Sequence, residues 1–294
     1  MTKEHILNCS PSNTEGTDWE YPVSTVEGKS LPENFTRRNS TYSVINQGSV
    51  GSCVGQAVRV AFGDTAQCKG EDISAMWIYK KAKHYDYWRG EEYSGTSISG
   101  ACKALLKEGG CVEEFYPYRM DTEEYEPEDG AAENASDRKI EAYYQIKHDN
   151  VDQIKEVVMR EPLIVSLQLR EKFYAVRKDG IVPSEKYFDS PIKGGHAMAV
   201  TGWKTIEGKT YWELQNSWGD RWANDGFCYI EWDVVKRSAS SNMYYLVTEG
   251  EEAKELHRAK KSSFWKRVVN SFMGCLQGIL SFFTREIFKN RKKK

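Results

Sequence analysis

The chain has 294 residues, of which 39% are hydrophobic, and its formal net charge at pH 7 is −2. This length allows one large domain or two lobes that share a core, and the hydrophobic content excludes a chain that is disordered throughout. The small net charge gives no overall basic field, so we expect no nucleic-acid partner.

Residues 1–31 are polar and are interrupted by proline and glycine, which predicts an extended N-terminal arm. Two interpretations of this arm stay open: a disordered lead-in, or a short plug over a cleft that is removed or displaced on activation. The beginning of the chain lacks the apolar stretch of a secretory signal. Seven cysteines make no disulfide-dense scaffold, so we expect a reducing, cytoplasmic compartment in which thiols stay free.

The residue pattern that follows the arm is typical of helices. Apolar and small side chains recur at helical spacing over 53–68, directly after the glycine-rich turn 48–52. A second helix is expected over about 99–108, where the glycine pair 109–110 stops it. The acidic stretch 119–138 has few large apolar residues and is predicted to be a solvated loop or crossover between two lobes.

Beyond about residue 141 the pattern changes to short β-branched and aromatic runs. A short helix is expected first, over 151–159, with Asn150 as its N-cap. Five strands are then predicted, at 163–169, 196–203, 210–216, 226–232 and 243–248. The prediction is therefore an α+β fold with two lobes, a helical left lobe at about 32–140 and a β-barrel-like right lobe at about 141–250.

Three separated segments contain the residue types of a thiol nucleophile and its partners. They read QGSVGSC at 47–53, KGGHAMAV at 193–200 and QNSWGDRW at 215–222. A cysteine at a helix N-terminus faces the positive end of the helix dipole, which lowers the pKa of its thiol. This places Cys53 as the candidate nucleophile.

The other two segments supply the groups that such a thiol needs. His196, on a strand of the other lobe, is placed to pair with the thiolate and to protonate a leaving amine. Asn216 is placed to accept from the His196 ring and to fix its tautomer. Gln47 can donate to a developing oxyanion together with the Cys53 backbone N–H.

These segments resemble the papain-like cysteine peptidases, whose signature is Q-x-G-x-x-G-S-C, then a Gly/Asn-His-Ala segment, then N-S-W-G-x-x-W. The resemblance covers about residues 31–250 and implies a two-lobe papain-like fold with an active cleft between the lobes. It also implies an endopeptidase that forms a Cys53 thioester, with His196 as acid and base, Asn216 as orienting residue and Gln47 as oxyanion donor. No metal or organic cofactor is expected, and the substrate would be a polypeptide.

The resemblance further implies the residues that line the cleft. Trp218 would shield the bond between Asn216 and His196 from water. The substrate ledge and its second subsite would be formed by Gly95, Thr96, Ser97 and Ile98, with Gly194, Gly195 and Ser166 opposite. Because none of these side chains is large or acidic, we expect an open subsite that tolerates apolar side chains.

Several positions depart from the secreted members of the family. Val54 stands where tryptophan usually follows the nucleophile, and Val50 replaces a cysteine of the usual left-lobe disulfide. Thr96 and Ser97 replace a glycine and an aromatic residue of the usual ledge. These departures resemble the compact bacterial, phage and giant-virus members, and none of them removes a catalytic group.

Two alternative functions remain at this point. The same acyl-enzyme chemistry could serve a deamidase or an acyl transferase. The chain could also be an idle peptidase-fold scaffold that is recruited through residues 251–294.

Residues 251–294 differ from the rest of the chain, with twelve Lys and Arg against four Asp and Glu. Apolar side chains over 264–288 follow a helical period, which predicts a basic amphipathic C-terminal helix. The favoured interpretation is a helix that lies on an anionic membrane surface, anchored by Trp265. Tail-anchored insertion, or docking on the catalytic domain or a protein partner, are the alternatives.

Overall fold

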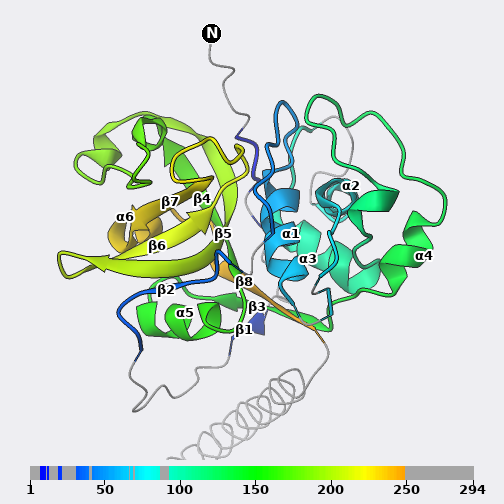
Figure 1. Cartoon of the computed structure of the whole chain (residues 1–294), viewed down its shortest axis with the longest axis horizontal. Coiled ribbons are helices and arrows are strands. Elements are labelled where there is room, and N and C mark those ends of the chain that lie inside the picture. Colours follow the sequence, from blue (N-terminus) through cyan, green and yellow to red (C-terminus); the bar gives the residue numbers. More distant parts are fainter. Residues whose placement is uncertain are drawn as a thin grey trace, which may run out of the picture. The chain divides into compact units, whose positions relative to one another are not determined.

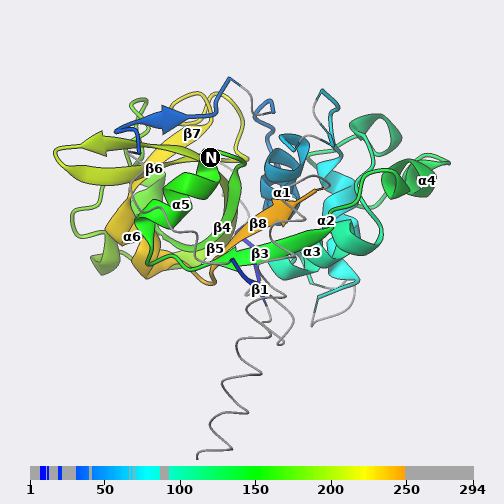
Figure 2. The ribbon, with the colours of Figure 1, turned by 90° about the horizontal axis from the view of Figure 1, so that it is seen from below.

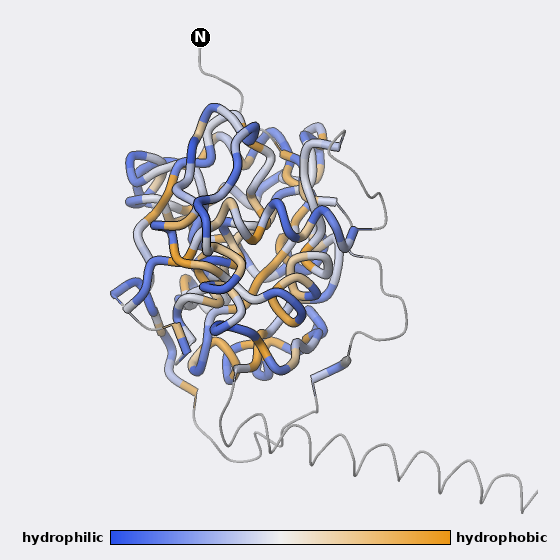
Figure 3. Tube along the Cα trace, turned by 90° about the vertical axis from the view of Figure 1, so that its right-hand side faces the viewer, coloured by the Kyte–Doolittle hydropathy of each residue, from blue (hydrophilic) through white to orange (hydrophobic). Residues whose placement is uncertain are grey.

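The computed structural model describes residues 7–10, 12, 19–21, 31–39, 42–65, 67–68, 70–86 and 93–248. Within these residues helices α1 to α4 lie in one half of the molecule, and most strands lie in the other half together with α5 and α6 (Figure 1). The predicted α+β arrangement of two lobes is therefore confirmed. Hydrophobic stretches run through the interior, and hydrophilic segments lie mainly outside (Figure 3).

Helix α1 (Cys53–Gly63) lies at the junction of the two lobes, and every one of its residues is buried. Its side chains share one apolar core with Ile98 and Leu105 of the helical lobe and with Ile164 and Tyr244 of the sheet. The sequence predicted a helix as far as residue 68, but α1 ends five residues earlier. Small alanines, valines and glycines let this helix approach its neighbours on all sides, as a helix buried all round requires.

Two further helices complete the centre of the helical lobe. Helix α2 (Ala75–Lys83) is capped by Ser74, whose hydroxyl accepts from the Trp77 N–H. Helix α3 (Ile98–Lys107) is capped in the same way by Ser97 and confirms the helix predicted over 99–108. Gly109, at a φ of +84°, turns the chain away after α3, as the glycine pair predicted.

The acidic stretch 119–138 is not wholly a solvated loop, and that prediction was wrong at its C-terminal end. Residues Ala131–Ser136 form helix α4, which follows a 3₁₀ turn, η1 (Glu113–Phe115). Ala131 and Ala135 are buried in a cluster with Tyr116. These two alanines form the apolar face of the helix, which is hard to recognise in the sequence because charged residues surround them.

The described strands form one eight-stranded sheet, ordered β1-β3-β8-β4-β5-β6-β7, with β2 also pairing with β5. Their bounds are Trp19–Glu20 (β1), Phe35–Thr36 (β2), Ala142–Ile146 (β3), Leu163–Arg170 (β4), Ile192–Ile206 (β5), Lys209–Gln215 (β6), Phe227–Glu231 (β7) and Met243–Val247 (β8). The five predicted strands are confirmed as β4 to β8. All pairs are antiparallel except that of β1 with β3, and β3 and β8 run towards the helical lobe (Figure 2).

Short helices cover the sheet. Helix α5 (Val151–Val158) begins where predicted, since the Asn150 side chain accepts from the Gln153 N–H. The 3₁₀ turns η2 (Glu171–Ala175) and η3 (Tyr187–Asp189) and helix α6 (Trp232–Ser238) were not predicted.

The first residues after the arm lie on the sheet side of the molecule, although they were assigned to the helical lobe. Phe35 pairs with Trp203 of β5, and the Arg38 guanidinium donates to the buried Glu213 of β6 at 2.9 Å. The chain thus crosses from the sheet to the helical lobe before it reaches Cys53.

The predicted C-terminal helix over 264–288, and residues 251–294 as a whole, lie outside the described residues. Among the residues that are described, none of the helices has the length and apolar character needed to cross a membrane.

Candidate active site

Cys53 is the first residue of α1 and is fully buried. The first N–H groups of a helix have no acceptor within it, so the Cys53 N–H is oriented towards the start of the helix. Ser52 precedes it but does not cap the helix, because its hydroxyl lies 2.5 Å from the Tyr118 hydroxyl instead. The Tyr118 hydroxyl donates in turn to the Gln47 carbonyl at 2.9 Å. Tyr118 therefore joins the two ends of the turn that presents Cys53.

The structure brings His196 and Asn216 together. His196, buried on β5, has its Nε2 2.7 Å from Asn216 Oδ1. The Ser217 N–H donates to the same Oδ1 at 2.8 Å, which identifies this atom as the amide oxygen. Nε2 must therefore carry a proton and donate it, and Nδ1 is the nitrogen left to exchange a proton with a thiol.

Aromatic rings enclose this pair. The Trp218 ring lies 5.2 Å from the His196 ring, and only 4% of Trp218 is exposed. Tyr174 stacks on Trp218 at 5.4 Å, and Phe173 and Trp222 meet it edge to face. The surroundings of the bond between His196 and Asn216 are thus apolar, which strengthens the bond by excluding water.

Gln47, the predicted oxyanion donor, is fully buried. Its Oε1 accepts from the Ser217 hydroxyl at 2.6 Å, and its Nε2 donates to the Val50 carbonyl at 3.1 Å. The bond from Ser217 fixes which end of the amide is oxygen, so Nε2 faces the turn that leads to Cys53. Ser217 thereby holds both amides, because its hydroxyl donates to Gln47 and its N–H donates to Asn216.

The Cys53 thiol is placed to be a thiolate. Its pKa is lowered well below the ordinary value, first by a hydrogen bond from the Cys9 side chain and then by the hydrogen bond and charge of His196, against the effect of burial. The pKa of Cys9 is raised, first by its interaction with the Cys53 side chain and then by burial. The two shifts have opposite directions, and the lowered pKa favours the thiolate on Cys53.

The predicted substrate ledge is held from behind by a carboxylate. Buried Asp86 accepts from the Thr96 hydroxyl at 2.5 Å and from both the N–H and the hydroxyl of Ser97. Burial raises the pKa of Asp86, although these three donors oppose the shift. Ile98 is fully buried in the core, so the ledge presents backbone rather than an apolar side chain there.

The second half of the predicted cleft lies on β4 and β5. Gly195 pairs with Gln168, and two residues further along the same strands Ser166 pairs with Ala197. A Cβ on Gly195 would lie 2.3 Å from the Cys9 carbonyl oxygen, and one on Gly95 would lie 2.0 Å from the Asn8 carbonyl oxygen. The glycines therefore allow a peptide backbone to lie directly on both ledges.

The sequence alone missed three residues of this site. No local pattern in the polar arm marks Cys9. Asp86 lies ten residues before Thr96, in a stretch without a recognised motif. Tyr118 lies outside the three motif segments, although its hydroxyl donates to the Gln47 carbonyl.

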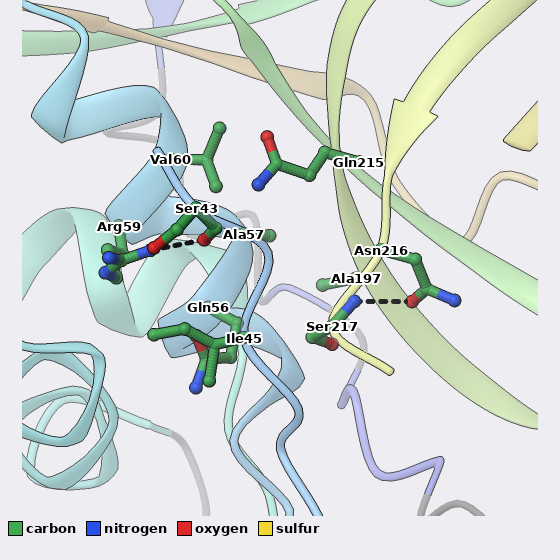
Figure 4. A pocket seen from close by; sticks show the side chains of 10 residues that line it. All are labelled: Ser43, Ile45, Gln56, Ala57, Arg59, Val60, Ala197, Gln215, Asn216 and Ser217. Atoms are coloured by element: carbon green, nitrogen blue, oxygen red, sulfur yellow. Dashed lines mark hydrogen bonds between the residues drawn. The ribbon is translucent and has the colours of Figure 1, made fainter. Parts of the chain in front are cut away.

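A small cavity of about 10 Å³ lies behind Asn216, between α1 and the strands β5 and β6 (Figure 4). This is the space of about one water molecule. The side chains of Gln56 and Gln215 border it, and the Arg59 guanidinium nearby donates to the Ser43 carbonyl. It is too small for a substrate.

Comparison with known proteins agrees with this geometry. A family model described as "Papain family cysteine protease" matches residues 31–247. A cysteine protease of Blomia tropicalis is 27% identical over 213 residues, which cover 69% of this chain and 62% of that protein. An uncharacterized peptidase C1-like protein of Acanthamoeba polyphaga mimivirus is also 27% identical, over 70% of each chain.

Solved structures show the same fold. The structure of xylellain, a cysteine protease from Xylella fastidiosa, aligns with a TM-score of 0.72 at 19% identity. The alignment covers 83% of this chain and 96% of xylellain. The bromelain protease from Ananas comosus, in a complex with the E64 inhibitor, aligns with a TM-score of 0.57 at 20% identity and is covered completely.

Proposed function

Since the chain belongs to the papain family of cysteine proteases, we propose that it is an endopeptidase that hydrolyses polypeptides through an acyl-enzyme on Cys53. The observation that carries this proposal is the hydrogen bond between His196 and Asn216, together with the lowered pKa of the Cys53 thiol. A structural cysteine buried among apolar side chains would have its pKa raised, as Cys228 does.

In the proposed first half-reaction, the Cys53 thiolate attacks the carbonyl carbon of the scissile peptide bond. The negative charge moves to the carbonyl oxygen, where the Cys53 N–H and Gln47 Nε2 donate to it. The C–N bond then breaks as His196 transfers a proton to the departing amine, leaving a thioester on Cys53.

In the second half-reaction His196, now neutral, takes a proton from water, and the hydroxide formed attacks the thioester carbonyl. The acid product leaves, and Cys53 returns as the thiolate beside protonated His196. Asn216 keeps the ring oriented through both steps because its Oδ1 also accepts from the Ser217 N–H. Gly95 and Gly195 would align the substrate backbone on the two ledges.

A digestion experiment tests the proposal. The reduced chain, with and without residues 2–17, is incubated with an unfolded protein, and the products are identified by mass. We expect internal backbone cuts that disappear in Cys53→Ala and persist in Cys228→Ala, a matched change of a buried cysteine outside the site. Cuts that persist in Cys53→Ala, or no cuts by either wild-type form, would contradict the proposal.

We also propose that the protein works in a reducing, cytoplasmic compartment. The six cysteines among the described residues are all buried free thiols, and the proposed nucleophile must stay reduced. Labelling of cell fractions with an antibody would test this, because recovery in an oxidising compartment would contradict it.

Association with an anionic membrane through residues 264–288 remains a proposal from the sequence pattern alone. Flotation of the full chain and of residues 1–250 with anionic liposomes tests it. Equal partitioning of the two would refute the membrane interpretation and favour docking on a protein.

A further inference from the structure

A segment of the N-terminal arm occupies the cleft. The Cys9 N–H donates to the Gly195 carbonyl at 2.9 Å, and the Ser10 N–H donates to the Thr96 carbonyl at 3.0 Å. The Asn8 side chain donates to the Ser94 hydroxyl at 2.7 Å. Residues 7–10 are thus a short strand between the two ledges, visible in dark blue between β5 and α1 (Figure 1).

This strand places a second thiol against the nucleophile. Only 7% of Cys9 is exposed, and its side chain belongs to the same buried cluster as Cys53. The Ser166 hydroxyl lies 3.1 Å from Cys9 Sγ on its other side. Because both the backbone and the side chain of Cys9 are held, its sulfur is fixed within the buried cluster that also contains Cys53.

We propose that Cys9 and Cys53 are a redox pair that hydrogen peroxide converts to a reversible intrachain disulfide, which locks residues 7–10 in the cleft. The proposal rests on the proposed function only in that Cys53 is the nucleophile. The disulfide would keep polypeptides out and would shield the Cys53 sulfur from irreversible oxidation.

The chemistry balances with peroxide as the only oxidant. The Cys53 thiolate attacks one peroxide oxygen, the O–O bond breaks, and Cys53 becomes a sulfenic acid as hydroxide leaves. The Cys9 sulfur then attacks the Cys53 sulfur, the S–O bond breaks, and the hydroxyl group leaves as water with the Cys9 proton. Two sulfurs have together lost two electrons, and one peroxide has been reduced.

Cys9 becomes a better attacking group once the first step is complete. The pKa of Cys9 is raised first by its interaction with the Cys53 thiolate, then by burial and by the thiolate's charge. Formation of the sulfenic acid removes that charge, while the hydroxyl of Ser166 remains beside Cys9 and favours its thiolate. The first step therefore favours the second.

Mass spectrometry of the full chain tests the proposal without depending on proteolysis. The reduced protein is exposed to hydrogen peroxide, quenched with catalase, alkylated under denaturing conditions and digested. We expect a cross-linked peptide that joins Cys9 to Cys53 and disappears on treatment with dithiothreitol. The control Cys228→Ala should form the same link.

The variant Cys9→Ser keeps a hydroxyl donor at this position but cannot form the link. After peroxide and dithiothreitol, it should contain about tenfold more Cys53 as sulfinic or sulfonic acid than the wild type. Equal irreversible oxidation of Cys53 in both forms, or links that join Cys53 to other cysteines, would overturn the proposal. A cross-link found in a chain that cuts no peptides would contradict the proposed function and leave this inference standing.

Discussion

At the scale of single residues, Tyr118 is the clearest case of a side chain that acts through others. Its hydroxyl donates to the Gln47 carbonyl and is paired with the Ser52 hydroxyl, so it connects Gln47 to the residue that precedes Cys53. Neither contact reaches a substrate. We therefore regard Tyr118 as a positioning residue.

Tyr118→Phe should lower kcat by about tenfold with little change in KM, because the turn loses its anchor while the ledges remain intact. It should also cost about 1–3 kcal/mol of unfolding free energy, since a buried acceptor is left unpaired. Steady-state kinetics and urea unfolding measure both. Tyr125→Phe, which loses a similar bond to the Pro117 carbonyl, serves as the control. Equal losses of kcat in the two variants would contradict a positioning role.

Asp86 holds the predicted substrate ledge, because it accepts hydrogen bonds from Thr96 and Ser97. Asp86→Ala, in the reduced chain without residues 2–17, should raise KM for a peptide by about tenfold while kcat changes less, because Thr96 and Ser97 lose their common acceptor. Asp64→Ala removes a different buried carboxylate, paired with Arg37. That control should lower stability without raising KM, and a rise in KM there would refute a specific role of Asp86.

At the scale of elements, the sequence predicted those with a strong period or a clear end. The helix α3 has an apolar face and a glycine stop, and α5 has an asparagine cap, so both were found. Helix α4 was missed because only its two buried alanines distinguish it from a charged loop. Strand β3 was missed because all five of its residues are buried, so it shows no alternation of polar and apolar side chains.

The 3₁₀ turn η1 contains a group whose titration affects stability. Burial raises the pKa of Glu113 to about 7, although the Tyr118 N–H donates to its carboxylate. The folded state therefore holds a proton that the unfolded state releases at lower pH. Stability contributed at Glu113 is complete below the ordinary glutamate pKa and is lost as the pH rises through about 7.

Glu113→Gln keeps an acceptor for the Tyr118 N–H and cannot ionise. Its melting temperature relative to the wild type should thus rise between pH 5 and pH 8, by roughly a few degrees. Scanning calorimetry across this range measures the difference. Glu114→Gln, at the exposed neighbour, should show no such trend, and a parallel trend there would argue against burial as the cause.

At the scale of the whole molecule, the fold brings the motif segments together through two contacts, His196 with Asn216 and Gln47 with Ser217. Each segment could be found in the sequence because its motif is local. The position of residues 7–10 could not be predicted in this way. Their contacts are backbone hydrogen bonds to Gly195 and Thr96, and such bonds depend little on side-chain pattern. The sequence could suggest a plug, but only the fold shows which residues of the arm pair with Gly195 and Thr96.

Removal of residues 2–17 should raise kcat/KM of the reduced protein by on the order of tenfold or more, since a tethered segment competes at an effective concentration near millimolar. The deletion keeps β1 and the packing of Tyr21 on Tyr144 and Tyr245. A synthetic peptide of residues 2–17 should inhibit the shortened chain. Equal kcat/KM for the two chains would mean that residues 7–10 do not restrict access.

The most direct test of the account is intact-mass analysis of the reduced protein after treatment with an E64-type epoxide, which alkylates an activated thiolate. We predict one adduct, on Cys53, that forms faster without residues 2–17 and is absent from Cys53→Ala. An adduct that remains in Cys53→Ala, or its absence from both wild-type forms, would contradict the claim that Cys53 is an activated nucleophile in an accessible cleft.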